Sequence, residues 1–165
     1  MISKEDKQRI RQIIKQGDLE SLKDALKDNQ ELLNAETAFG TWLEVAAEFG
    51  QLDIVRYLIG RGIDVNKSCG VVEGGPINIT SFKGYLDVLK LLMENGAVPD
   101  ISTAERNPLF AAVYNGHLDV VKFLVENGID YRASYAVGSI DKCDACEYAR
   151  QYGRSEIVEY LKSQM

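Results

Sequence analysis

The sequence has 165 residues, of which 45% are hydrophobic and 27% are charged, and its formal net charge at pH 7 is −6. This composition suits a folded chain with one continuous core and excludes an intrinsically disordered one. The negative balance argues against binding to nucleic acid or to an anionic membrane surface, because phosphate groups are held by clustered Lys and Arg side chains.

The cellular setting is predicted from what the sequence lacks. It contains no apolar run of roughly eighteen residues, so no membrane-spanning helix and no membrane partner are expected. The opening residues, Met1 to Asp6, are polar and are not followed by the apolar stretch of a signal peptide. The chain has 3 cysteines, an odd number that favours reduced thiols over a disulfide framework. The expected location is the cytoplasm.

The first predicted element is an amphipathic helix over residues 3–15, which places Ile10, Ile13 and Ile14 on one stripe. Ser3 and Asp6 have the spacing of a capping box at its start. A second helix is predicted from about Leu19 to Lys27, followed by a loop over residues 29–39 that turns the chain back. The other face of the first helix is charged, as a terminal unit without a neighbour requires.

A short pattern then recurs through the rest of the chain: glycine, any residue, Leu, Asp, and an apolar helix. Clear copies begin at Gly50, Gly84 and Gly116, and weaker copies begin at Gly17 and Gly153, so the intervals are 33, 34, 32 and 37 residues. Neither helix of such a unit could bury its apolar stripe alone. A period of this length therefore predicts a stack of two-helix units.

The fullest copy reads Pro108-Leu109-Phe110-Ala111-Ala112, then Gly116-His117-Leu118-Asp119-Val120-Val121, then Glu126-Asn127-Gly128-Ile129-Asp130. It resembles the ankyrin-repeat family, whose signatures are T-P-L-H-x-A-A and G-H-L-x-V-V-x-L-L-x-x-G-A-D, and the resemblance extends over essentially the whole chain. The resemblance implies an all-α ankyrin-repeat solenoid of about five helix-turn-helix repeats with capping terminal repeats. It implies one domain over residues 1–165, a monomer, with repeats at about 1–35, 36–68, 69–101, 102–134 and 135–165.

This sequence departs from the family pattern in two ways. The T-P-L-H element is eroded in every copy, reading Thr41-Trp42-Leu43-Glu44, Gly75-Pro76-Ile77-Asn78, Asn107-Pro108-Leu109-Phe110 and Asp144-Ala145-Cys146-Glu147. The loops over residues 66–76 and 131–143 are longer than their counterparts. They are interpreted either as protruding binding loops or as tolerated surface insertions.

Residues that could carry chemistry are few, and no catalytic residue, metal site or cofactor is predicted. His117 is the only histidine and takes the histidine position of the G-H-L motif, so a packing role is favoured over catalysis or metal binding. Cys143 and Cys146 have C-x-x-C spacing without a second pair. Cys146 falls on a buried leucine position, which favours packing. The protein is not expected to be an enzyme.

A binding surface is expected from the resemblance, on the concave side formed by loop tips and by the residues just before each repeat glycine. The pairs before Gly50, Gly84, Gly116 and Gly153 each include an aromatic residue, and exposed aromatic side chains dominate protein interfaces. The alternative is that these rings pack between helices. The candidate residues are Phe39, Glu48, Phe49, Val71, Val72, Glu73, Phe82, Lys83, Glu105, Arg106, Tyr114, Asn115, Tyr135, Gln151 and Tyr152.

Two functions are compatible with these observations. The first is a protein-protein interaction module that binds a protein partner through its concave face and loop tips. The second, from resemblance to small acidic bacterial ankyrin proteins, is an immunity protein that neutralises a cognate toxin by occlusion. Residues 31–165 carry the whole negative excess, which would speed the encounter with a basic partner such as a nuclease toxin. Negative charge also keeps proteins soluble without any binding role.

Overall fold

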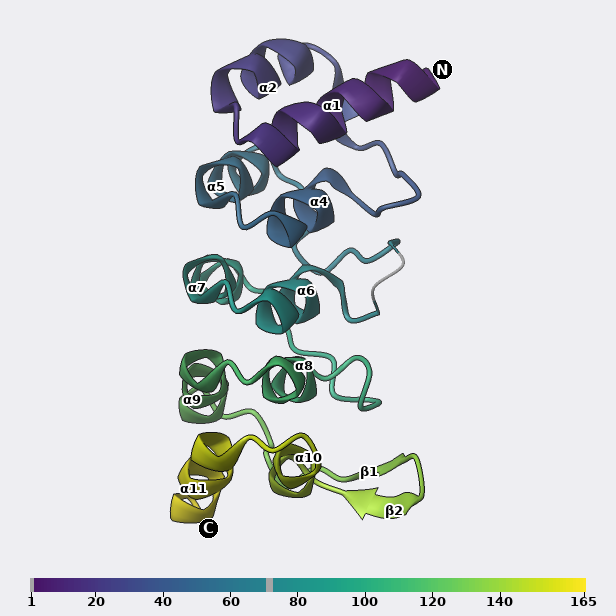
Figure 1. Ribbon diagram of the computed structural model, residues 1–165. Coiled ribbons are helices and arrows are strands. Elements are labelled where there is room, and N and C mark those ends of the chain that lie inside the picture. The colour runs from purple at the N-terminus through teal and green to yellow at the C-terminus, as the bar shows by residue number, and fades with distance from the viewer. Residues whose placement is uncertain (1, 71–72) are drawn as a thin grey trace.

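The computed structural model describes residues 2–70 and 73–165, and over these residues the chain is a stack of helix pairs (Figure 1). The first helices of the pairs are α1 (Lys4–Gln16), α4 (Trp42–Glu48), α6 (Gly75–Lys83), α8 (Pro108–Asn115) and α10 (Ala145–Gln151). The second helices are α2 (Leu19–Leu26), α5 (Leu52–Gly60), α7 (Leu86–Glu94), α9 (Leu118–Glu126) and α11 (Ser155–Ser163). The predicted all-α solenoid of paired helices is confirmed. The exact boundaries of its units stay a prediction.

Two segments predicted as plain loops contain regular structure. The connection after α2 includes a short helix, α3 (Gln30–Leu33), which Asn29 caps by accepting a hydrogen bond from the Leu32 amide at 2.8 Å. The long loop before α10 forms a hairpin of β1 (Tyr135–Val137) and β2 (Ile140–Cys143). Its strands are antiparallel and pair Tyr135 with Cys143 and Val137 with Ile140, with a bulge between the two pairs. The extra residues of this loop therefore make main-chain pairs instead of remaining irregular.

Side-chain caps fix where the first helices α1, α4, α8 and α10 begin, whereas α6 has no side-chain cap. The predicted capping box at α1 is confirmed, because the Ser3 hydroxyl accepts from the Asp6 amide and the Asp6 carboxylate accepts from the Ser3 amide. A second capping box joins Thr41 and Glu44 at the start of α4. Each cap satisfies amide groups that have no partner within the helix. The capped helices therefore start in a fixed register relative to the loops before them.

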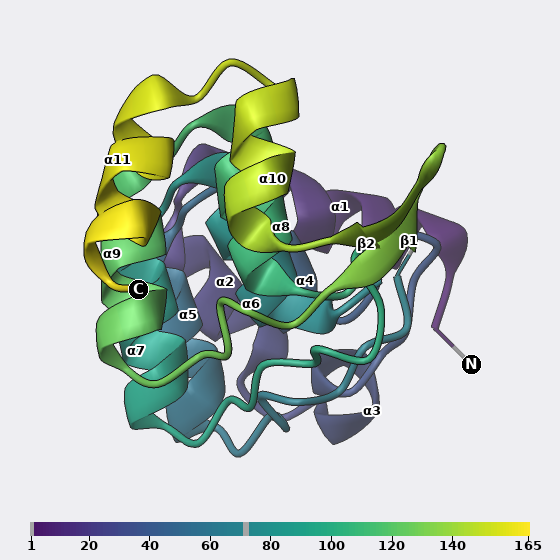
Figure 2. The same cartoon turned by 90° about the horizontal axis from the view of Figure 1, so that it is seen from below.

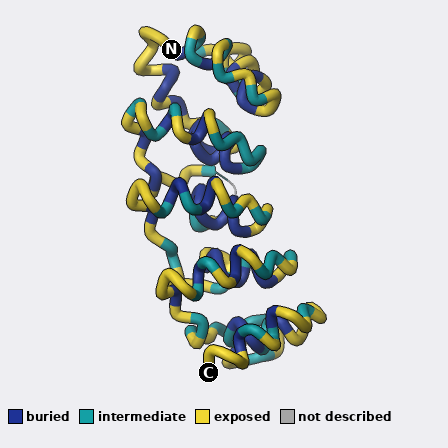
Figure 3. Tube along the Cα trace, turned by 90° about the vertical axis from the view of Figure 1, so that its left-hand side faces the viewer, coloured by how far each residue is buried: buried dark blue, intermediate teal, exposed yellow. Residues whose placement is uncertain are grey.

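The core lies between the layers. First helices pack on first helices from α1 through α4, α6 and α8 to α10, while α5 contacts α7 and α9 contacts α11. The view along the stack shows these two columns side by side, with the loops and the hairpin projecting from the first-helix column (Figure 2). Buried segments recur in every layer, and exposed segments lie toward solvent (Figure 3). Burial of the facing apolar side chains is the main stabilising term.

After three of the repeat glycines, Gly50, Gly116 and Gly153, the next residue links its layer to the one before. Gln51 donates to the Lys15 carbonyl at 3.2 Å, and Arg154 donates to the Tyr114 carbonyl. The Nε2 of His117 lies 3.1 Å from the Phe82 carbonyl, which fits the structural role predicted for this histidine. These contacts require close approach, and a Cβ atom on Gly84 would lie 2.5 Å from the Nδ1 of His117.

We expect Gly84→Ala to lower the free energy of unfolding by about 2–3 kcal/mol, because the backbone φ of Gly84 is +78° and the new methyl group would strike His117. The matched control is Gly96→Ala, since Gly96 has a φ of +87° but nothing within 4 Å of an added Cβ. Its expected cost is about 1 kcal/mol, from backbone strain alone. Urea denaturation measures both. Equal losses in the two variants would contradict the proposed contact with His117.

Candidate functional site

Exposed aromatic side chains form a continuous row across the ends of the last three first helices. Phe82, Tyr114 and Tyr152 expose 42%, 40% and 42% of their surfaces. The rings of Phe82 and Tyr114 are stacked with centroids 6.0 Å apart, and Tyr152 meets Tyr114 edge-on at 4.8 Å. These three residues, which we call the aromatic row, were all predicted from their position before a repeat glycine. The alternative that they are packed away in the core does not hold for them.

The aromatic row continues inward through the half-buried ring of Tyr148 and the buried ring of Phe110. Tyr148 lies 4.8 Å from Tyr152 and 4.9 Å from Phe110, centroid to centroid. Burial, together with a hydrogen bond to Tyr152, raises the pKa of the Tyr148 hydroxyl. Tyr148 therefore stays neutral at physiological pH. The exposed rings therefore pack against other side chains and have limited freedom. They would lose little conformational entropy when a partner binds.

A separate aromatic cluster lies at the N-terminal end of the same face. Phe39 is 50% exposed, and the Arg11 guanidinium lies 4.0 Å from its ring centroid. Arg11 also lies 5.4 Å from the half-buried ring of Phe49, and its Nη2 is 3.7 Å from an Oε2 of Glu48. Phe49 and Glu48, both predicted as contact residues, are therefore partly engaged within the chain. Arg11 was not predicted.

Between these two aromatic groups lies an open cavity of about 220 Å³. Phe39 stands on one side and Phe82 on the other. Its lining residues are Phe39, Glu44, Glu48, Gly70, Ile79, Phe82 and Lys83. We call this cavity the α4–α6 groove. Ile79 was not predicted as a site residue, although its position one helical turn before Phe82 places it on the same face.

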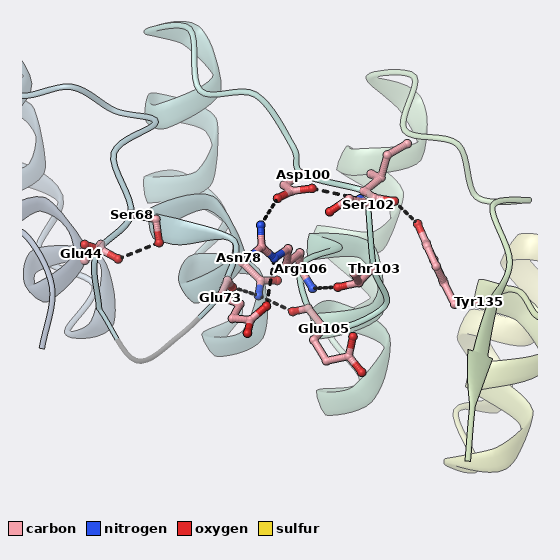
Figure 4. Close-up of polar contacts among 11 residues, drawn as sticks. Glu44, Ser68, Glu73, Asn78, Asp100, Ser102, Thr103, Glu105, Arg106 and Tyr135 are labelled. Carbon is pink, nitrogen blue, oxygen red and sulfur yellow. Dashed lines mark hydrogen bonds and ion pairs between the residues drawn. The ribbon is translucent and has the colours of Figure 1, made fainter. Parts of the chain in front are cut away.

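The eroded histidine position of T-P-L-H supports the loops that border this face. Glu44 is 1% exposed and accepts hydrogen bonds from the amides of Cys69 and Gly70, each at 3.3 Å, and from the Ser68 hydroxyl (Figure 4). In the next unit Asn78 donates to the main-chain carbonyls of Glu73 at 2.6 Å and Glu105 at 2.9 Å. Different side chains therefore tie successive loops to the first helices.

The loop tips of the third and fourth units meet through an ion-pair cluster. Arg106 pairs with Glu73 at 2.9 Å and with Asp100 at 3.2 Å (Figure 4). Hydrogen bonding to Glu73 raises the pKa of the guanidinium, and hydrogen bonds from Ser102 and Arg106 lower the pKa of the Asp100 carboxyl. The predicted site residues Glu73 and Arg106 are thus brought together. They face solvent, so their pairing contributes little to stability.

The other predicted site residues differ in how accessible they are. The Tyr135 hydroxyl donates to the Ile101 carbonyl at 2.6 Å and accepts from Asn107 at 3.0 Å, so this half-buried residue ties the hairpin to the preceding unit. Asn115 is similarly engaged, donating to the Phe82 carbonyl at 2.7 Å. Lys83, Glu105 and Gln151 are exposed. Val71 and Val72 lie outside the described residues.

The negative charge does not gather on this face. Helices α4, α6, α8 and α10 carry three acidic and two basic residues, whereas α5, α7, α9 and α11 carry seven acidic and four basic ones. Helix α1 carries five basic residues and two acidic ones, and it packs beside α4. The α4–α6 groove is lined by Glu44, Glu48 and Lys83, and α1 adds positive charge beside it, so the groove is not the strongly acidic surface that the argument for a basic partner requires.

Within residues 2–70 and 73–165, no group of three or more His, Cys, Asp or Glu side chains is placed to hold a metal ion. Cys143 and Cys146 are buried, as the packing interpretation predicts, and burial raises the pKa of the Cys143 thiol. No helix over the described residues is long and apolar enough to cross a membrane.

Comparison with known families identifies the architecture. Residues 77–165 match the family model described as ankyrin repeats (3 copies), and residues 43–69 match a single ankyrin repeat. The chain belongs to the ankyrin-repeat family, as its sequence motifs predict. Ankyrin repeats indicate a protein-protein interaction module, and their fold is typically a non-catalytic scaffold.

Three curated proteins share repeats with this chain. An E3 ubiquitin-protein ligase of Caenorhabditis elegans, hecd-1, is 36% identical over 89 residues, which is 53% of this chain and 3% of that protein. Palmitoyltransferase AKR1 of Lachancea kluyveri is 30% identical over 95 residues, 54% of this chain and 13% of the transferase. An ankyrin repeat protein of Rickettsia felis is 37% identical over 68 residues, 41% of this chain and 30% of its own length. The chain thus spans less than a third of each relative, and the enzymes match it only over repeats.

Proposed function

We propose that this chain binds a protein partner across its first-helix face, with the aromatic row as the main contact. The observation that carries this proposal is the mutual contact of three side chains that each leave about two fifths of their surface exposed. Rigid aromatic side chains with such exposure bury a large area at low entropic cost and are common hot spots of interfaces. The loop-tip cluster of Arg106, Glu73 and Asp100 would border the bound partner.

The immunity-protein hypothesis remains a narrower version of this proposal. Toxin occlusion needs the same exposed surface, but no feature of the first-helix face distinguishes a toxin from another protein partner. A basic nuclease toxin is the version least supported, because α1, which packs beside α4 at one end of this face, carries five basic residues and two acidic ones. Protection of cells that express a candidate toxin is the measurement that would separate it from a general interaction module.

We expect Phe82→Ala and Tyr114→Ala each to weaken partner binding at least tenfold, because each removes exposed ring area from the aromatic row. The partner is first captured from the native cell with the unaltered protein, and affinities are then measured with purified components. Val98→Ala is the control, since Val98 is 68% exposed in the connection after α7, outside the aromatic row. If both ring variants lose thermal stability but keep the partner, the rings serve the core and the proposal is wrong.

A further inference from the structure

We infer that the α4–α6 groove binds a partner segment in which an apolar side chain lies next to one or more carboxylates. This inference rests on the proposed function and specifies the chemistry of its partner. It differs from the expectation of a basic partner, which was drawn from the net charge of the whole chain. Local charge at the groove leads to the opposite conclusion.

The apolar part of the inference follows from the shape and lining of the groove. The exposed rings of Phe39 and Phe82 border an open cavity of about 220 Å³, with Ile79 at its base. This is room for one side chain of the size of leucine, methionine or phenylalanine. Such a side chain would remove the two rings from water, and burial of apolar area is the general driving force for association.

The acidic part follows from which charges at the groove are already compensated. Its carboxylates are engaged within the chain: Glu44 by the amides of Cys69 and Gly70, and Glu48 by Arg11. Glu36, behind Phe39, pairs with Lys67 at 2.6 Å. Lys83 borders the groove, is exposed, and makes no ion pair with any residue among 2–70 and 73–165. Among the charged side chains that line the groove, Lys83 is therefore the one without a partner within the described residues.

Arg11 adds further hydrogen-bond donors beside the groove, although its charge is balanced by Glu48. Its guanidinium lies over the Phe39 ring, and its Nε is buried without a hydrogen-bond partner among the described residues. Its one ion pair, to Glu48 at 3.7 Å, is longer than a hydrogen bond. Phe39 also lines a neighbouring hollow, together with the three cations Lys4, Lys7 and Arg11 and the one carboxylate Glu36. A carboxylate beside the apolar side chain would meet this cluster and gain charge-assisted hydrogen bonds.

The test is selection of binders from a random twelve-residue peptide library displayed on phage, with the purified full chain as bait. We expect the selected peptides to be net negative and to place Asp or Glu within a few positions of Leu, Ile, Met or Phe. A synthetic copy of one such peptide should bind at least tenfold more tightly than its two matched forms, one with the acidic residues changed to lysine and one with the apolar residue changed to serine. Binding should weaken with added salt.

Variants of the protein locate the binding site. Lys83→Glu and Arg11→Gln should each weaken the acidic peptide at least fivefold, while Lys162→Glu, the same charge reversal on exposed α11, should leave it within twofold. Ile79→Phe should fill the groove and exclude the peptide, and far-ultraviolet circular dichroism checks that this variant folds. If Ile79→Phe does not fold, the exposed variants Lys83→Glu and Arg11→Gln decide the question.

Three results would overturn the inference. In the first, the library yields net positive peptides or no peptides at all. In the second, the acidic peptide and its lysine form bind equally well. In the third, a single-stranded oligonucleotide displaces the peptide, and its own binding depends on Lys83 and Arg11. Basic peptides that lose affinity in Phe82→Ala would refute the acidic partner while leaving the proposed function intact. Acidic peptides unaffected by changes at Phe82, Tyr114 and Lys83 would refute both.

Discussion

Trp42→Ala should lower the free energy of unfolding by about 3–5 kcal/mol, the range found when a large buried aromatic side chain is truncated. Trp42 is fully buried at the start of α4, and its Nε1 donates to the Leu32 carbonyl at 2.7 Å. This bond joins α4 to the short helix α3 of the preceding unit. The variant therefore loses both packing and a link between the first two layers.

The control for this prediction is Trp42→Phe, which keeps most of the apolar volume but leaves the Leu32 carbonyl without its donor. Its expected cost is about 1–2 kcal/mol. Urea denaturation followed by circular dichroism measures both variants, because the chain has 1 tryptophan and its fluorescence is lost with the change. A loss below about 1 kcal/mol for Trp42→Ala would show that the first unit does not depend on this contact.

The helix pairs could be predicted because their signals are local. Apolar residues at helical spacing and a glycine at each turn act within one unit, and the capping box of Ser3 and Asp6 spans only one helical turn. The aromatic row could be predicted for the same reason, since Phe82, Tyr114 and Tyr152 stand one or two residues before a repeat glycine. The hairpin over residues 135–143 was missed because its strands are short and lack clear alternation.

The surroundings of the groove could not be predicted, because they depend on contacts between units. Arg11 lies in the first unit, whose copy of the repeat pattern is weak, and its contact with Phe39 exists only once α1 packs on α4. Net charge was equally misleading. It sums acidic residues of the second helices with a basic α1, although these lie in different columns of the stack. Local charge is what a partner meets within a Debye length.

The contacts between first helices and loops could not be predicted either, because the residue at the histidine position of T-P-L-H makes a different kind of contact in each unit. Glu44 accepts from amides of the next loop, Asn78 donates to carbonyls, and Phe110 packs edge-on against Tyr135 with centroids 5.1 Å apart. Glu44, Asn78 and Phe110 all stand where the family signature T-P-L-H has histidine. What the three residues share is their place at the start of a first helix, facing the loop of the following unit.

This arrangement predicts that Glu44→Ala costs about 2–4 kcal/mol of unfolding free energy, since the amides of Thr41, Cys69 and Gly70 would lose an acceptor in a buried setting. Glu147→Ala is the matched control, because Glu147 occupies the same position in the last unit. It is half-buried and pairs with Arg150 at 2.7 Å on the surface, so its loss should stay below about 1 kcal/mol.

Urea denaturation of the two variants, followed by both circular dichroism and Trp42 fluorescence, measures this difference. Glu44→Gln should fall between them, because its amide keeps one acceptor oxygen but turns a donor toward amides that also donate. Similar losses for Glu44→Ala and Glu147→Ala would mean that the loop contacts of Glu44 add nothing to stability. The expected large loss at Glu44 would instead show that Glu44, which stands where the family signature has histidine, stabilises the contact between one unit and the next. Because Glu44 and Gly70 both line the α4–α6 groove, the same substitution should loosen its walls and weaken any peptide bound there.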